Sequence, residues 1–184
     1  MRTSISRLAS MSLLVAVAVV LKRLASVRIA IGAVEGIRIG FGSLPIVLAG
    51  ALFGPWGGAA VGAVEDMVGY FINPMGPYMP HFTLTSALTG FIPGLVLWFR
   101  REQLPSLLHL VLAIASGQVV VSLGLTPYFL QVLFGIPRSV TIPPRLVALV
   151  IDLVLYTSLV HVLLRRLSSS GALVRLGPVR QLRA

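Results

Sequence analysis

Long apolar stretches separated by short polar ones make up most of this chain. A helix that crosses a bilayer needs about 20 predominantly apolar residues, and the pattern predicts six such helices. We expect them at 6–27, 41–53, 56–72, 83–99, 105–125 and 144–164, with 125–134 either extending the fifth helix or beginning a loop. Between the first two we expect a polar loop at 28–40. The expected fold class is an all-α integral membrane protein, a compact six-transmembrane-helix bundle, with one domain over residues 1–184.

The start of the chain has an alternative interpretation. Arg2 and Arg7 precede the first apolar run, as in a secretory signal. However, Lys22 and Arg23 follow the run, and no small-x-small cleavage pattern precedes them. We therefore expect the first helix to be retained.

The stretch 38–94 carries the most information. Pro55 and the glycines beside it predict a turn between the second and third helices. The spacing of Gly50, Gly54, Gly58 and Gly62 predicts a small-residue face on one helix, against which neighbouring helices can pack closely. A polar, proline-rich break runs from Asn73 to His81. Such a break survives at membrane depth only where protein covers it or where it lines a cavity. The sequence therefore predicts a bundle with a ligand pocket on the extracellular side.

Composition supports a membrane protein and excludes several other classes. The chain is 57% hydrophobic and 11% charged, whereas a soluble domain is nearer a quarter charged. It has no cysteine, which excludes disulfides and thiolate metal sites. A net charge of +10 would indicate nucleic acid as the partner of a soluble protein. Here most basic residues flank apolar spans, so we interpret them as topology signals and contacts to anionic membrane lipid, with no nucleic-acid partner.

The placement of basic residues also predicts orientation. More of them fall on the side of the N-terminus, so we expect both termini to be cytoplasmic, with a basic tail over 165–184. The remaining basic residues are expected outside: Lys22, Arg23, Arg28, Arg38, Arg138 and Arg145. Positive charge on this disfavoured side indicates an anionic ligand captured from outside. The expected location is the plasma membrane.

The break and the helix after it offer hydrogen-bonding groups at Asn73, Tyr78, His81, Thr83 and Thr85. One interpretation is the wall of a site for a planar ligand. The other is a rigid connector between two helices, with Thr83 as the N-cap of the second.

Carboxylates within apolar segments are a second candidate feature. Ionisable groups in a membrane are costly and are usually functional. Glu65 and Asp66 either form an ion pair with Arg38 or another arginine, or contact ring nitrogens and exocyclic amines of a ligand. Asp152 lies seven residues after Arg145, on the same helix face, and either pairs with a basic residue of a neighbouring helix or contacts the ligand.

Catalytic and metal motifs are not found in the sequence. The chain contains no HExxH, GxSxG or Walker-type motif, so it has no known route to hydrolyse ATP. His109 and His161 are isolated in apolar segments, where a hydrogen-bonded interior histidine is the expected role. We expect no metal, no cofactor and no enzymatic activity.

Several motifs together resemble a known family. They are Gly40–Phe41, Leu44–Ile46, the FGPW motif at Phe53–Trp56, Asp66, the block Pro74–Thr85 and the IPPRL motif at Ile142–Leu146. The chain resembles the S component of an energy-coupling-factor (ECF) vitamin transporter and is most similar to the folate family. The resemblance implies a subunit that binds a vitamin from outside and joins a membrane T component and two cytoplasmic ATPase subunits.

The resemblance also implies site residues. The expected ligand-binding residues are Arg38, Phe41, Asp66, Asn73, Tyr78, His81, Thr83, Thr85, Arg145 and Asp152. The Ala-x-x-x-Ala face that docks the family's first helix on the T component corresponds here to Ser12 and Ala16. The alternative for this pair is packing inside the bundle. His81 replaces a common glycine, and the sixth helix lacks the family's Lys-Gln and later Gln, for which Asp152 and Tyr156 are possible substitutes.

Other functions stay open at this point. Within the same class, the ligand is another vitamin or precursor, such as pantothenate or a queuosine precursor. A different class is an intramembrane enzyme using Glu65, Asp66 and a histidine. A third is a scaffold protein without a ligand.

Overall fold

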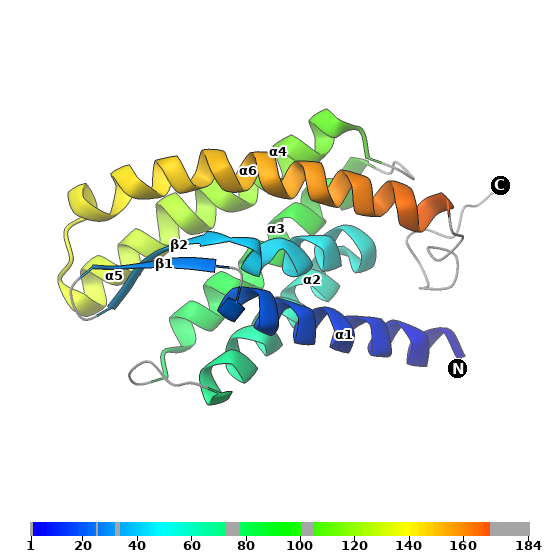
Figure 1. Cartoon of the computed structure of the whole chain (residues 1–184), viewed down its shortest axis with the longest axis horizontal. Coiled ribbons are helices and arrows are strands. Elements are labelled where there is room, and N and C mark those ends of the chain that lie inside the picture. Colours follow the sequence, from blue (N-terminus) through cyan, green and yellow to red (C-terminus); the bar gives the residue numbers. More distant parts are fainter. Residues whose placement is uncertain (1, 25, 32–33, 73–77, 101–104, 170–184) are drawn as a thin grey trace.

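The computed structural model is a bundle of apolar helices with one small β-hairpin (Figure 1). It describes residues 2–24, 26–31, 34–72, 78–100 and 105–169, with the backbone alone at 2–4, 26–31, 34–39 and 100. The elements are α1 (Arg2–Leu24), β1 (Ser26–Ile31), β2 (Val34–Gly40), the 3-10 turn η1 (Phe41–Ser43), α2 (Leu44–Ile72), α3 (Pro80–Arg100), α4 (Leu107–Gln118), the π-helical segment η2 (Val119–Leu125), α5 (Thr126–Phe134) and α6 (Arg138–Ser169).

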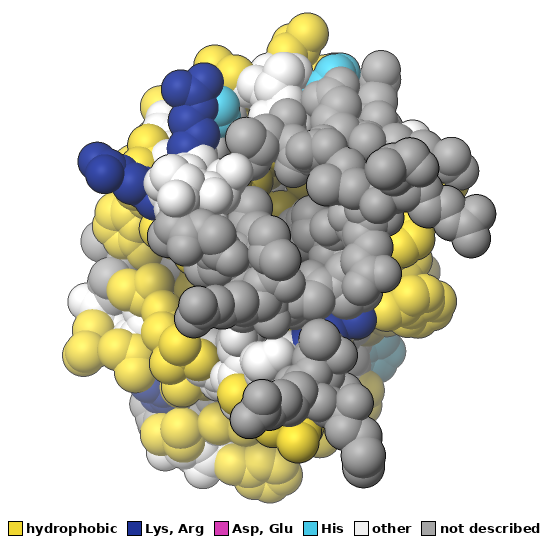
Figure 2. All heavy atoms as spheres, turned by 90° about the vertical axis from the view of Figure 1, so that its right-hand side faces the viewer, with side chains coloured by type: hydrophobic (Ala, Val, Ile, Leu, Met, Phe, Trp, Pro, Cys, Tyr) yellow, Lys and Arg dark blue, Asp and Glu magenta, His cyan; other side chains and the backbone are white. Residues whose placement is uncertain are grey.

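Five helical stretches in the described residues are long and apolar enough to cross a membrane. They are Ile5–Leu24, Phe41–Ile72, Pro80–Phe99, Leu107–Phe134 and Arg138–Ser169. Many of their large apolar side chains are exposed, and Figure 2 shows hydrophobic side chains around the end where α1 begins and α6 ends. Exposed apolar surface of this extent fits lipid as the surrounding solvent. The helical membrane fold class is confirmed to this extent.

The predicted turn at Pro55 is present as a break inside α2. Gly54 has φ 80° and ψ −175°, a backbone conformation that glycine adopts readily, and Pro55 follows it. The proline has no backbone N–H, so the helical hydrogen-bond ladder is interrupted there. As a result α2 consists of two helical halves that meet at Gly54.

The prediction of one continuous glycine face is wrong, because this break divides it. Gly50 and Gly58 lie on different halves of α2 and face each other. A Cβ atom on Gly58 would lie 2.7 Å from the Gly50 Cα and 2.5 Å from the Gly90 carbonyl oxygen. A Cβ atom on Gly62 would collide with the Ser86 carbonyl of α3. The glycines therefore allow three helical segments, the two halves of α2 and α3, to pack backbone against backbone.

The loop expected at 28–40 is a β-hairpin instead. Strands β1 and β2 pair antiparallel, with Ser26 opposite Gly40 and Arg28 opposite Arg38. Alternating β-branched residues at Val27, Ile29 and Ile31 carry a strand signal, which is short and is interrupted by the charged Arg28. The hairpin lies between α1 and α6 in Figure 1.

Several helix boundaries differ from those expected. The first helix ends at Leu24 rather than Val27, because the chain enters β1 directly afterwards. The fourth expected helix is α3, which begins at Pro80 rather than Thr83, so His81 and Thr83 lie inside it and Thr83 is not its N-cap. Proline is tolerated there because first-turn N–H groups have no partner within the helix.

The fifth and sixth expected helices are also longer than their shortest expected bounds. The stretch 125–134 extends the fifth helix through η2 and α5, which was one of the two expectations. The sixth helix begins at Arg138 rather than Pro144 and includes Pro143 and Pro144.

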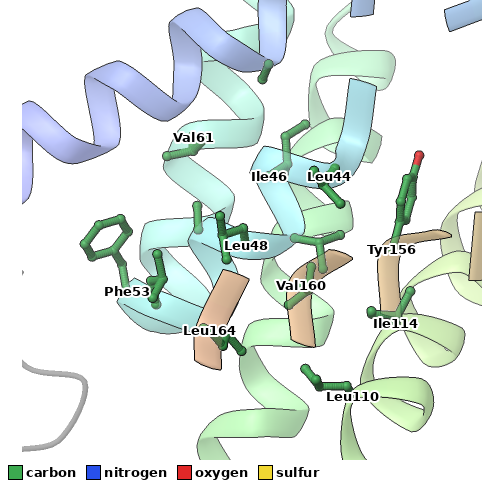
Figure 3. Close-up of a cluster of buried hydrophobic side chains, with 14 residues drawn as sticks. Leu44, Ile46, Leu48, Phe53, Val61, Leu110, Ile114, Tyr156, Val160 and Leu164 are labelled. Atoms are coloured by element: carbon green, nitrogen blue, oxygen red, sulfur yellow. The ribbon is translucent and has the colours of Figure 1, made fainter. Parts of the chain in front are cut away.

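The hydrophobic core lies between α2, α4 and α6, with Ala18 of α1 at its edge. Ile46, Leu110, Ile114 and Val160 are almost completely buried in it (Figure 3). The Tyr156 ring belongs to the same cluster, and its hydroxyl points out of the cluster. Packing of the ring in the core therefore fixes the position of the Tyr156 hydroxyl.

Gly58→Ala tests the close helix contact. The added methyl would strike the backbone of both Gly50 and Gly90, and backbone cannot move aside as a flexible side chain can. We expect a loss of about 1–3 kcal/mol in stability, the usual cost of overpacking. The measurement is the thermal unfolding midpoint in detergent. Gly124→Ala is the matched control, because its Cβ would meet nothing nearer than 3.7 Å. Equal midpoints for the two variants would contradict the packing described.

Candidate functional site

A polar cluster lies between α1, α2 and α3. It consists of Lys22, Glu65, Asp66, Tyr78, Thr83 and Ser86, and we call it the Lys22 cluster. The Lys22 ammonium donates to Glu65 Oε2 at 2.9 Å and to Asp66 Oδ1 at 3.5 Å. An ion pair was one of the two expectations for these carboxylates, but the partner expected was an arginine. The cation is a lysine instead, because α1 ends beside the part of α2 that follows Gly54.

Glu65 is the buried member of the cluster. Its side chain is 0% exposed, and Oε2 accepts from Lys22 and, at 3.3 Å, from the Ser86 hydroxyl. A buried carboxylate needs such partners, since desolvation otherwise makes its charge very costly. The same end of α1 has a second tie to α2, since Arg23 donates to the Gly69 carbonyl. Glu65 and Arg23 therefore join α1 to α2 at this level.

Asp66 is the accessible member, with 20% of its side chain exposed. Its Oδ2 accepts a hydrogen bond from the Thr83 hydroxyl at 2.8 Å. That hydroxyl also lies 2.7 Å from the Tyr78 phenol oxygen. The Tyr78 ring packs edge-on against Tyr70, with 5.2 Å between ring centroids. A carboxylate, two hydroxyls and an aromatic wall can accept N–H donors from a planar heterocycle and cover its ring.

Helix packing explains why these residues meet. The second half of α2 runs antiparallel to α3, since Gly58 meets Gly90 and Gly62 meets the Ser86 carbonyl. One turn further along α2 lies Asp66, and nearly one turn back along α3 lies Thr83. The register set by the glycine contact therefore brings Asp66 to Thr83.

A second polar contact lies at the base of the hairpin. Tyr156 of α6 donates to the Gly40 carbonyl at 2.6 Å, and Asp152 accepts a hydrogen bond from the Gly40 backbone. Gly40 has φ 145°, which few other residues adopt. Asp152 was expected to pair with a basic side chain or the ligand. Its observed partner is the backbone that leads from β2 into Phe41, so α6 holds the hairpin at this point.

The other expected site residues lie in separate places. His81 is exposed on α3, and its ring is 5.0 Å from that of Phe129 on α5. Thr85 is buried and donates to the Phe82 carbonyl of its own helix at 2.7 Å. Phe41 is half-buried directly after Gly40. Arg145 is buried, two turns before Asp152 on α6.

The expected docking pair lies on α1, and some of the expected site residues lie outside the described part of the chain. Ser12 and Ala16 are exposed on one face of α1. Asn73, the side chain of Arg38 and most of the basic tail lie outside the described residues. The structure brings together Asp66, Tyr78 and Thr83, and it places Asp152 next to the backbone before Phe41. The convergence of Arg38, Tyr78, His81 and Arg145 on one cavity stays a prediction.

Sequence reasoning missed Lys22 and Ser86 as members of the site. Lys22 was counted among the basic residues expected outside and was not assigned to the site. A signal was present, since two carboxylates inside an apolar segment require a cation of matching depth. The basic residues at the end of the preceding helix, α1, are Lys22 and Arg23.

Tyr156→Phe tests the contact at the hairpin base. Without the hydroxyl, the Gly40 carbonyl loses a hydrogen bond worth about 1 kcal/mol. We expect faster backbone hydrogen exchange at 34–40, measured by mass spectrometry, with the core otherwise unchanged. Tyr128→Phe, on an exposed tyrosine of α5, is the matched control. Exchange at 34–40 that equals that of the control would contradict this role for Tyr156.

Comparison with known proteins supports the family resemblance that the sequence motifs indicate. The chain is 36% identical over 111 residues to a protein named folate transporter FolT from Clostridium novyi (strain NT), an alignment that covers 60% of this chain and 63% of that protein. The chain thus spans less than two thirds of that relative's length. A solved structure, titled as FolT bound with folic acid, matches with a TM-score of 0.70 and 28% identity. That match covers 84% of this chain and 88% of the other.

A family model matches almost the whole described chain. It is described as ECF-type riboflavin transporter, S component, and it matches residues 2–169. The recognition made from the sequence motifs is confirmed at the level of the S component. The chain therefore belongs to the family of S components of ECF-type riboflavin transporters.

Proposed function

We propose that this chain is a vitamin-binding S component that captures folate outside the cell. It then delivers the vitamin through a T component and two ATPase subunits. The observation that carries the proposal is the likeness, over 84% of this chain, to a structure titled as FolT bound with folic acid. The matched relatives are transporter subunits rather than enzymes, and the proposed role is binding without catalysis.

The proposed arrangement has six membrane crossings in one domain, with a basic cytoplasmic tail. Figure 1 supports it, since α1 begins and α6 ends at the same end of the molecule. Two ends on the same side of a membrane require an even number of crossings. The two halves of α2, on either side of Gly54, give this even number when each counts as one crossing. Arg7 supports a cytoplasmic N-terminus under the positive-inside rule, and so do the exposed Arg165 and Arg166. The proposed ligand pocket is then on the extracellular side, at the end where the hairpin and the Lys22 cluster lie.

The chemistry of the site residues fits the two ends of folate. The pterin ring offers N–H groups, and Asp66 and Thr83 can accept hydrogen bonds from them. Tyr78 offers a ring face. The glutamate end carries carboxylates, for which Arg38 and Arg145 supply positive charge. Phe41, Asn73, His81, Thr85 and Asp152 are the further proposed contacts or supports of this site.

Riboflavin is the second candidate, because the family description names it. Its flavin ring also offers an N–H group to a carboxylate. Riboflavin itself carries no carboxylate, so it offers no anionic group to the positive charge of Arg38 and Arg145. This difference favours folate. Pantothenate and a queuosine precursor remain weaker alternatives from the sequence.

Ligand binding by the isolated chain tests this proposal. We expect purified protein in detergent to bind folate without partners or ATP and to retain it through purification. The measurements are mass spectrometry of the co-purified small molecule and calorimetric titration with folate and with riboflavin. Arg145→Ala should weaken folate by about 1.5–3 kcal/mol, the scale of a charge-assisted hydrogen bond, and riboflavin much less. Tight riboflavin binding with no folate binding would reject folate as the ligand.

Docking on the T component makes a separate prediction. Ser12 and Ala16 are exposed, and small residues there allow a partner helix to approach closely. With Ala16→Leu we expect uptake by cells that also express the T component and ATPases to fall sharply. Folate binding by the isolated chain should stay near normal. Ala60→Leu, the same change at an exposed position of α2, is the control. Folate binding that falls together with uptake would instead indicate a packing role for Ala16.

A further inference from the structure

Lys22 occupies an unusual position between two adjacent carboxylates. Neighbouring residues of a helix point about 100° apart, so Glu65 and Asp66 are directed to different sides of α2. The Lys22 ammonium has three donor positions and contacts both, at 2.9 Å and 3.5 Å. One cation from α1 therefore determines where two acidic side chains of α2 are held.

The two carboxylates have different surroundings. Glu65 is completely buried, is the closer partner of Lys22 and also accepts from Ser86. Asp66 is partly exposed and has the longer contact to the ammonium. Glu65 therefore takes most of the charge compensation that Lys22 provides. Asp66 keeps negative charge available to another donor.

The orientation of Asp66 is fixed from two sides. Oδ1 faces Lys22, and Oδ2 accepts from Thr83, whose hydroxyl also contacts Tyr78. If Lys22 were absent, the carboxyl group could rotate away from this geometry. Thr83 alone would hold one of its two oxygens.

We propose that Lys22 is a positioning residue for the ligand site and acts through Asp66, whose carboxylate it holds toward Thr83 and Tyr78. This inference rests on the proposed function, in which Asp66 accepts hydrogen bonds from the ring of the vitamin. The group recognised is a nitrogen heterocycle with N–H donors. Because Lys22 belongs to α1, the helix that carries Ser12 and Ala16, the ligand site and the proposed docking face share one helix.

A purely structural role is the rival explanation. Lys22→Met leaves Glu65 buried without its cation, so this variant is expected to lose stability and is not informative alone. The double variant Lys22→Met with Glu65→Gln removes the buried charge as well. Its thermal midpoint in detergent should return near that of the wild type. Glu65→Gln alone is the control for the amide.

Folate titration of the stable double variant is the decisive measurement. We expect its dissociation constant to be about tenfold higher than that of the wild type or of Glu65→Gln. Adding Asp66→Asn to the double variant should change the affinity little, whereas Asp66→Asn alone should weaken binding by about tenfold. Such non-additive effects on folate affinity would show that Lys22 and Asp66 act together in binding. Arg23→Met is the matched control for loss of a positive charge at the same end of α1.

Several results would overturn the inference. One is a stable double variant that binds folate as well as Glu65→Gln does. Another is an Asp66→Asn effect of equal size in both backgrounds, since Lys22 would then not act through Asp66. If the wild type binds riboflavin but not folate, the proposed ligand fails, and the same series titrated with riboflavin decides on Lys22. Binding of neither vitamin rejects both the proposed function and the inference.

Discussion

The backbone contact between α2 and α3 is the constraint on which the rest of this structure depends. Gly58 meets Gly50 and Gly90, and Gly62 meets the Ser86 carbonyl, at separations that leave no room for a side chain. Lipid provides no hydrophobic drive between helices, so close packing of small residues takes its place. This contact covers the break at Gly54, where Arg7 of α1 also donates to the Phe53 carbonyl at 2.9 Å. The interrupted backbone at Gly54 and Pro55 is thereby covered by protein.

The candidate site follows from the same packing. Once Gly62 lies against Ser86, helix geometry places Asp66 against Thr83 and Glu65 near Ser86. The end of α1 then supplies the cation that two carboxylates at this depth require. At the base of the hairpin, α6 holds the Gly40 backbone through Tyr156 and Asp152. Polar groups on different helices thus have definite partners.

The sequence predicted the parts of this fold that depend on local chemistry. Apolar length located the spans, and Pro55 with its glycines predicted the break in α2. The motifs around Asp66 and Thr83 identified the S component, which the family match confirms. The hairpin at 26–40 was missed because its strand pattern is short and carries several charges. Lys22 was counted only among the basic residues expected outside, because no local feature indicates its partners, which come from α2 more than 40 residues later. The glycine spacing was noticed, but its face was misjudged, since Gly54 itself breaks the helix.

An experimental structure of the protein with folate would test the central claim most directly. The claim is that packing of α1, α2 and α3 builds a site where Asp66, Thr83 and Tyr78 receive the ring of the vitamin. We predict that the pterin ring lies within hydrogen-bond distance of Asp66 or Thr83, with Lys22 still between Glu65 and Asp66. Folate bound elsewhere, with the Lys22 cluster closed and distant from it, would contradict the claim.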